Sequence, residues 1–148
     1  MIERLVYTYC TFDGTTYLNN FPTIDSFVRV FSESIYESKK IFKEVVCYTD
    51  VEGQLKLKEL GIDIDTIIVD FLAYNFDRRF WNFPKLITYN MQDKPFVHID
   101  TDFIIYSFDK DSDVITERMR PCYIQRSYFR FLKELNDHYT PQLICSGC

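Results

Sequence analysis

The sequence predicts an α/β protein with a Rossmann-like, mostly parallel sheet flanked by helices. Short apolar runs alternate with segments of helical periodicity, in the order strand, helix, strand, helix, strand, helix, strand. The apolar runs are continuous, which is typical of parallel strands that are buried on both faces. The 148 residues contain no internal repeat and no Pro-, Gly- or Ser-rich linker, so one domain over 1–148 is expected.

The first half is predicted to contain two strands, each followed by a helix. Pro22 suits the first turn of the first helix, whose apolar residues recur at helical spacing as far as Lys40, and positive charge at that end complements the helix dipole. Gly61 is a favourable C-cap for the second helix. The predicted strands are 4–10 and 44–49, and the predicted helices are 22–40 and 51–60.

The second half is predicted to add two strands, 66–69 and 96–99, with a helix between them. Residues 78–92 have helical character, but Pro84 lacks a backbone donor, so a helix that starts near Pro84 also satisfies the sequence. An apolar stretch at 103–106, a strand around 122–125 and a last helix over 127–135 complete the prediction.

Three of the predicted strands are followed directly by an aspartate: Asp50, Asp70 and Asp100. Ligands of parallel sheets bind outside the carboxyl ends of the strands. The three carboxylates therefore predict an acidic rim that faces a ligand. The alternative is that each is only a polar residue where the chain leaves the core.

The sharpest motif is Asp100-Thr101-Asp102, at the end of the last apolar strand. Two carboxylates separated by one residue can reach one divalent cation if the chain bends there. Mg²⁺ and Mn²⁺ favour oxygen ligands, and Mg²⁺ typically takes one or two carboxylates together with substrate phosphates and water. Such a metal bridges a diphosphate and stabilises the charge that develops on it as a leaving group. The motif therefore predicts Mn²⁺ or Mg²⁺ at Asp100 and Asp102.

The stretch WNFPKLITYNMQDKPFVHIDTD, residues 81–102, resembles nucleotide-sugar glycosyltransferases of the GT-A fold, in which a helix precedes a strand that ends in the metal-binding DxD motif. It is especially similar to an uncharacterised bacterial branch in which a W…K…Y helix leads into PFxHxDxD. The segments LVYTY at 5–9, VVCYTD at 45–50 and LGI at 60–62 fit that pattern too. The resemblance covers 1–107 as the donor-binding part of a truncated GT-A-like fold and leaves 108–148 as a short C-terminal extension.

The resemblance implies a metal-dependent glycosyltransferase, or its donor-binding half, that binds a nucleotide-diphosphate sugar. Asp100 and Asp102 would hold the Mn²⁺ or Mg²⁺, and Asp50 would accept a hydrogen bond from the base. Lys85 faces either the diphosphate or solvent. The catalytic residues and the acceptor are unassigned, and a homo-oligomer or a missing C-terminal half would supply the acceptor side. The implied donor-binding residues are Tyr9, Cys10, Thr11, Asp50, Lys85, Asp100 and Thr101.

Two other functions stay open at this point. A non-catalytic nucleotide-sugar-binding or interaction module would have the same fold. The motif also resembles the first motif of haloacid-dehalogenase-like phosphotransferases, in which Asp100 would be the nucleophile and Asp102 an acid/base. That family carries the motif on its first strand, whereas three predicted strands precede it in this chain.

Charge and cysteine content limit the partners and the compartment. The 17 Lys and Arg residues against 22 Asp and Glu residues give a net charge of −5, which disfavours binding to nucleic acid. No apolar run is long enough for a membrane span, no signal peptide is recognisable, and the odd number of cysteines fits a reducing compartment. A cytoplasmic location is therefore expected. Cys145 and Cys148 are interpreted as incidental thiols, the alternative being half of a zinc site with Cys122 and His138.

His98 is expected to be a satisfied core histidine, on the opposite strand face from Val97 and Ile99. Aromatic residues make up 18% of the chain, and most of them are expected to fill the core. A few fall in predicted loops, where they are expected to cover an interface with a second subunit or with the missing half: Phe71, Tyr74, Phe76 and Tyr139.

Overall fold

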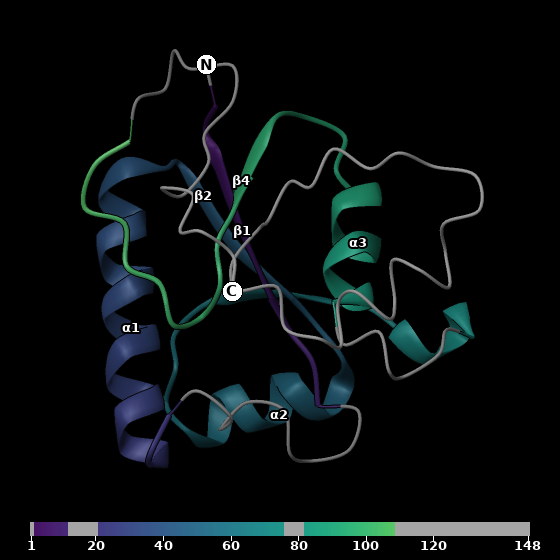
Figure 1. The fold of residues 1–148 in the computed structure, drawn as a ribbon, viewed down its shortest axis with the longest axis horizontal. Helices are drawn as coiled ribbons and strands as arrows, with labels where there is room; N and C mark the ends of the chain where they lie inside the picture. Colours follow the sequence, from purple (N-terminus) through teal and green to yellow (C-terminus); the bar gives the residue numbers. More distant parts are fainter. Residues whose placement is uncertain (1, 12–20, 76–81, 109–148) are drawn as a thin grey trace, which may run out of the picture. The chain divides into compact units, whose positions relative to one another are not determined.

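The computed structural model describes residues 2–11, 21–75 and 82–108. Four strands pair in parallel in the order β3-β2-β1-β4, with helices on both faces of the sheet (Figure 1). The prediction of an α/β protein with a Rossmann-like parallel sheet is therefore confirmed. The elements are β1 (Arg4–Tyr9), α1 (Ile24–Ile41), β2 (Glu44–Thr49), α2 (Val51–Glu59), β3 (Asp65–Ile68), the 3₁₀ helix η1 (Phe71–Tyr74), α3 (Phe83–Asn90) and β4 (Phe96–His98).

The four strands predicted between residues 4 and 99 and the first two helices are confirmed to within two residues at each end. For the third helix, the version that starts near Pro84 is observed. α3 begins at Phe83, and Pro84 lies in its first turn, where the missing backbone donor breaks no helical hydrogen bond.

The chain divides into two units, Met1–Asp111 and Ser112–Cys148, and all described residues belong to the first. The single domain over 1–148 stays a prediction. Several expectations lie outside the described residues: the strand around 122–125, the helix over 127–135, and Cys122, His138, Cys145 and Cys148.

α1 begins at a capping box and buries one side against the sheet. The N–H of Ser26 donates to Thr23 Oγ1 at 3.1 Å, and the N–H of Thr23 donates to Ser26 Oγ at 3.2 Å. The buried positions follow helical spacing and include two serines: Phe27, Phe31, Ser34, Ile35 and Ser38.

No helix within the described ranges is long and apolar enough to cross a membrane.

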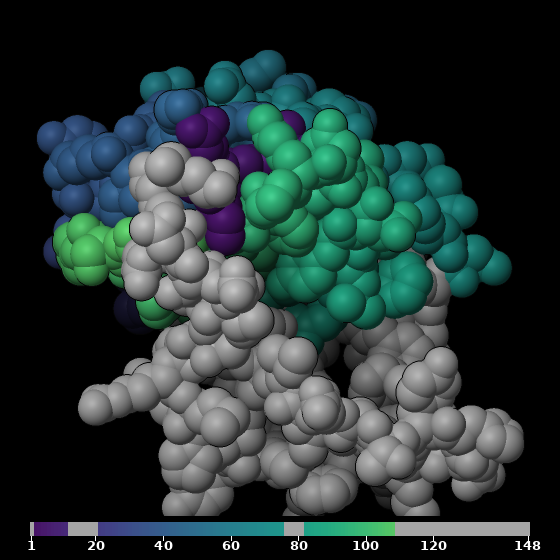
Figure 2. Space-filling view, turned by 90° about the horizontal axis from the view of Figure 1, so that it is seen from above, coloured from purple at the N-terminus to yellow at the C-terminus, as the bar shows by residue number. Residues whose placement is uncertain are grey.

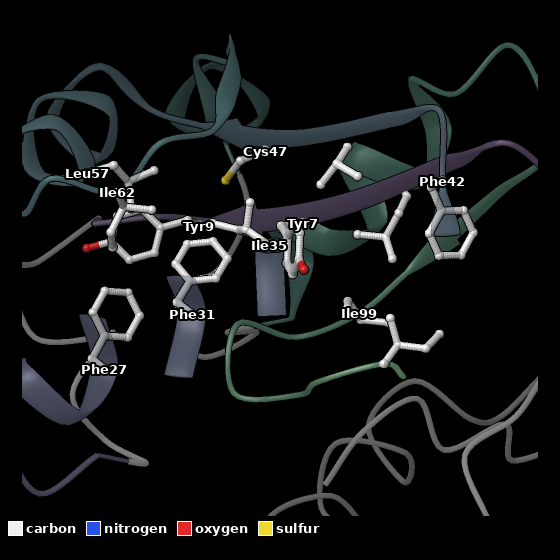
Figure 3. Packing of buried hydrophobic residues seen from close by; sticks show 13 residues of the cluster. Tyr7, Tyr9, Phe27, Phe31, Ile35, Phe42, Cys47, Leu57, Ile62 and Ile99 are labelled. Atoms are coloured by element: carbon white, nitrogen blue, oxygen red, sulfur yellow. The ribbon is translucent and has the colours of Figure 1, made fainter. Parts of the chain in front are cut away.

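Two apolar clusters cover the two faces of the sheet. The α1-side cluster takes Leu5, Tyr7 and Tyr9 from β1 and packs them against residues of α1 and α2 (Figure 3). The α3-side cluster takes Val6 from β1 and includes residues of β2, η1 and α3, namely Val46, Tyr48, Phe71 and Ile87. β1 is thus covered on both faces, which explains its continuous apolar sequence.

Phe71 corrects one expectation from the sequence. Its ring is 1% exposed and belongs to the α3-side cluster, so it is a core residue and covers no interface. The sequence placed it in a loop because η1 is too short to show helical periodicity; Asp70 caps this helix and turns Phe71 towards the sheet. Tyr74 is exposed, whereas Phe76 and Tyr139 lie outside the described residues.

The residues after β4, 99–108, cross from the sheet to α1 without regular secondary structure, and we call them the crossing segment. Ile105 belongs to the α1-side cluster, and Phe108 packs on Phe42 with ring centroids 5.0 Å apart. Figure 2 shows the last described residues, in bright green, among the blue residues of α1 and apart from the darker green of β4. The crossing segment therefore connects the end of β4 to the helical layer that contains α1.

α2 approaches the ends of β1 and β2 so closely that only glycine fits at residue 53. A Cβ built on Gly53 would overlap Thr49 Oγ1 and would lie 2.7 Å from Asp50 Oδ1 and 3.1 Å from Tyr9 Cδ1. Thr49 is fully buried, so its side chain has no space into which to move.

Gly53→Ala is expected to lower the free energy of unfolding by roughly 2–3 kcal/mol, because the added methyl group forces α2 away from the strands. Gly61→Ala is the matched control. Gly61 has a φ of 70° and nothing within 4 Å of an added Cβ, so only its left-handed backbone opposes the change, at about 1 kcal/mol. Urea unfolding of the three proteins measures both effects. A loss for Gly53→Ala no larger than the loss for Gly61→Ala would contradict the close approach.

Candidate functional site

The candidate site lies at the carboxyl edge of the sheet, where β1 and β4 are neighbours. The two strands pair from Arg4↔Phe96 to Val6↔His98, and the N–H of Ile99 then donates to the Val6 carbonyl at 3.2 Å. α1, which follows β1, covers one face of the sheet, and α3, which precedes β4, covers the other (Figure 1). This is a topological switch point, the place where open α/β sheets bind their ligands.

The Asp100-Thr101-Asp102 motif forms a tight turn at the end of β4. The N–H of Phe103 donates to the Asp100 carbonyl at 3.1 Å and closes the turn. Asp100 and Thr101 are half-buried, and Asp102 is exposed. The chain therefore bends at the motif, as a site with two carboxylates on one cation requires.

Lys85 lies at the same edge, beside the first aspartate of the motif. Lys85 Nζ is 2.6 Å from Asp100 Oδ1, and the two side chains are 16% and 31% exposed. Lys85 reaches this edge because α3 starts at Phe83 and places it in the first helical turn. Lys85 is therefore paired with the motif and is not a fully solvent-exposed lysine, whereas its contact with a diphosphate stays a prediction.

Asp50 is occupied by protein donors. Its Oδ2 accepts from the N–H of Thr11 at 2.9 Å and from the thiol of Cys10 at 3.4 Å. Its Oδ1 accepts from the Thr11 hydroxyl at 3.0 Å and from the N–H of Gly53 at 2.6 Å. A carboxylate offers about four acceptor positions. This arrangement favours a structural role, in which Asp50 fixes the loop after β1 to the start of α2, over the base contact that the resemblance implied.

Tyr9 is placed differently from the expectation that it lines a nucleotide. Its ring is 3% exposed and stacks on Phe27, with centroids 5.9 Å apart, in the α1-side cluster (Figure 3). The alternation of side chains along β1 turns Tyr9 into the core. Of the loop that follows, Thr11 is buried and Cys10 is half-buried, so Cys10 has the more accessible side chain.

His98 is a half-buried histidine whose ring is hydrogen-bonded, as expected for a satisfied histidine. Its Nε2 is 3.0 Å from Thr8 Oγ1, which donates to Thr88 Oγ1 at 3.0 Å, and its ring stands edge-on to Tyr89. Burial, together with the charge of Lys85, lowers the pKa of His98 to about 3, so the ring is neutral at pH 7. The sequence did not predict its partners: alternation places Thr8 on this face of β1, but no pattern places α3 opposite it.

The motif carries two carboxylates, the ligand type that hard divalent cations prefer. Within the described ranges, no three His, Cys, Asp or Glu side chains are close enough together to hold one metal ion. A cation at this turn could take at most the two carboxylates of Asp100 and Asp102 from the motif, with phosphate and water as its other ligands, as Mg²⁺ commonly does. The residues fit Mg²⁺ or Mn²⁺, because all of their donor atoms are carboxylate oxygens.

Acid is expected to destabilise the fold through His98. The unfolded chain binds a proton at this histidine near pH 6.5, whereas the folded chain binds it only near pH 3, so stability falls as the pH drops through this window. A difference of one proton corresponds to about 1.4 kcal/mol per pH unit. Urea unfolding at several pH values, with a chelator present, measures the slope, and His98→Gln is expected to flatten it. The same pH dependence in both proteins would contradict the neutral, hydrogen-bonded histidine.

Neither a curated protein nor a solved structure matches this chain. One family does match, a family of unknown function designated DUF6734, over residues 20–135. The matched part is more than half of the chain and contains Lys85 and the turn that carries Asp100 and Asp102. The chain therefore belongs to DUF6734, a family of unknown function.

Proposed function

We propose that this protein binds a nucleotide-diphosphate sugar together with Mn²⁺ or Mg²⁺, as the donor site of a glycosyltransferase. The observation that carries the proposal is the position of the turn that holds Asp100 and Asp102. It lies directly after β4 and beside the end of β1, at the switch point of the sheet. Two carboxylates next to a lysine at this place suit a ligand that brings both phosphate groups and a divalent cation.

In the proposed complex, Asp100 and Asp102 hold the cation. When bound, the cation supplies stabilisation of the negative charge that develops on the leaving nucleoside diphosphate. The two carboxylates and the Lys85 ammonium together carry one negative charge, so a divalent ion makes the site positive. A positive site at the edge of the sheet attracts the diphosphate.

Lys85 is proposed to contact the diphosphate. Its ammonium is already at the motif, 2.6 Å from Asp100, and largely withdrawn from solvent. A charged donor in such a position makes a stronger hydrogen bond to a phosphate oxygen than a fully exposed lysine does.

The loop after β1 is proposed to line the nucleotide through Cys10 and the backbone of Thr11. Asp50 contributes indirectly, because it holds both residues in place. The buried Cys47 is a reduced thiol, which fits a reducing compartment and a cytoplasmic location. The acceptor side is proposed to come from a second copy of the chain or from a further segment.

Asp102→Ala is expected to weaken the binding of a nucleotide-diphosphate sugar at least about tenfold in the presence of Mn²⁺, because a carboxylate ligand is lost. Isothermal titration with UDP-, GDP- and dTDP-sugars measures the affinity. Asp63→Ala is the control. Asp63 lies before β3, and its exposed carboxylate pairs with Lys39 of α1. Equal, negligible binding by the unaltered protein and by Asp102→Ala would overturn the proposal.

Lys85→Met is expected to weaken nucleoside diphosphate binding about tenfold and to leave the affinity for Mn²⁺ alone unchanged or higher, because the lost ammonium faces phosphate and competes with the cation for Asp100. Lys94→Met is the control. It removes a lysine that precedes β4 and pairs with Glu44, away from the motif. Titrations with UDP and with Mn²⁺ separate the two effects. A weaker affinity for Mn²⁺ alone would contradict the assignment of Lys85 to the diphosphate.

Turnover separates an enzyme from a binding module of the same fold. If the site is catalytic, the protein is expected to release free sugar from the bound donor, and chromatography measures that release. Donor binding without any release would support the non-catalytic module instead.

A further inference from the structure

We infer that Ser34 and Tyr7 are positioning residues for the turn that carries Asp100 and Asp102, and that they act through the main-chain carbonyl of Phe103. The inference rests on the proposed metal and nucleotide site at this turn. It adds two side chains from the interior of the fold that touch neither the cation nor the nucleotide.

The contact joins the buried side of α1 to the last residue of the turn. Ser34 is fully buried, and its hydroxyl donates to the Phe103 carbonyl at an Oγ–O distance of 2.5 Å. The N–H of the same Phe103 closes the turn on the Asp100 carbonyl. Both backbone groups of Phe103 are therefore engaged, one inside the turn and one in the core.

The hydrogen bonds behind this contact have a fixed direction. Ser34 Oγ is 2.7 Å from the Tyr7 hydroxyl, which is 3.0 Å from Ser38 Oγ. A carbonyl has no proton to give, so Ser34 must donate to Phe103, Tyr7 must donate to Ser34, and Ser38 donates to Tyr7. Tyr7 belongs to the α1-side cluster (Figure 3), and Ser34 and Ser38 are also fully buried. In such surroundings a chain of hydrogen bonds is strengthened by the low local polarity.

This chain of hydrogen bonds holds the end of the turn that lies farther along the sequence from β4. On the side of β4, the turn is held by the hydrogen bond from Ile99 to Val6. At the other end of the turn, the Phe103 ring is 38% exposed. The next residue of the crossing segment that is buried in the α1-side cluster is Ile105. The Ser34 hydroxyl therefore fixes the backbone at Phe103, the residue directly after Asp102. A small displacement of Phe103 would move the Asp102 carboxylate relative to the Asp100 carboxylate.

Ser34→Ala and Ser38→Ala form a matched pair. Both remove one hydroxyl from the same buried face of α1, and both remove a partner of Tyr7, but only Ser34 contacts the turn. Ser34→Ala is expected to weaken the binding of Mn²⁺ with UDP about three- to tenfold, the effect of one lost hydrogen bond, and Ser38→Ala less than about twofold. Thermal unfolding of both variants reports their stability.

Amide hydrogen exchange by NMR tests the turn without any ligand. The Phe103 amide is expected to exchange several-fold faster in Ser34→Ala than in Ser38→Ala. If Ser34→Ala does not fold, Tyr7→Phe takes its place, because it removes the donor to Ser34 and leaves the ring in the core; an effect in the same direction is expected.

The outcomes distinguish this inference from the proposed function. Binding of Mn²⁺ and UDP by the unaltered protein, with equal affinity in both serine variants, overturns the positioning role alone. Unchanged exchange of the Phe103 amide in Ser34→Ala overturns it whatever the ligand result. No binding of Mn²⁺ with any of UDP, GDP and dTDP by the unaltered protein overturns the proposed function, and the positioning role at that site falls with it.

Discussion

The parallel pairing of β1 with β4 is the interaction on which the candidate site depends. These strands are far apart in the sequence, and only a short register, from Arg4↔Phe96 to Val6↔His98, brings their carboxyl ends together. That register places the loop after β1 beside the turn after β4. It also sends α1 and α3 to opposite faces, so Lys85 and the crossing segment approach the turn from different sides. Parallel pairing over so few residues is weak by itself, and the two apolar clusters hold it in place.

The sequence was sufficient for the four strands and the first two helices of the described part, and for placing the Asp100-Thr101-Asp102 motif at a strand end. Continuous apolar runs identified all four strands, because both faces of this sheet are covered, and Pro84 indicated one of two possible starts for the third helix, the one observed for α3. The sequence was not sufficient for roles that depend on the third dimension. A carboxylate at a strand end is suited equally to a ligand and to the cap of the next helix, and only the structure shows that Asp50 serves as the cap.

Polar groups in the core were the least predictable part of the structure. Two serines four residues apart on the apolar face of α1 are a signal in the sequence, since helical spacing places Ser34 and Ser38 together against the sheet. Their partner could not be identified, because the hydroxyl of Tyr7 comes from a strand and the Phe103 carbonyl from irregular chain. In a core this rich in aromatic side chains, directional bonds of this kind select one packing among several that satisfy the apolar surfaces equally.

The contact between Ser34 and Phe103 has a consequence for how the evolution of this family is interpreted. One partner is a main-chain oxygen, which every amino acid supplies, so this contact makes no demand on the side chain at position 103, whereas it requires a hydrogen-bond donor on the side chain at position 34. Two residues that touch in this way do not covary. Coevolution methods, which infer contacts from paired substitutions, are therefore insensitive to the link between α1 and the turn, and such links must be inferred from an invariant small polar residue on an apolar helix face.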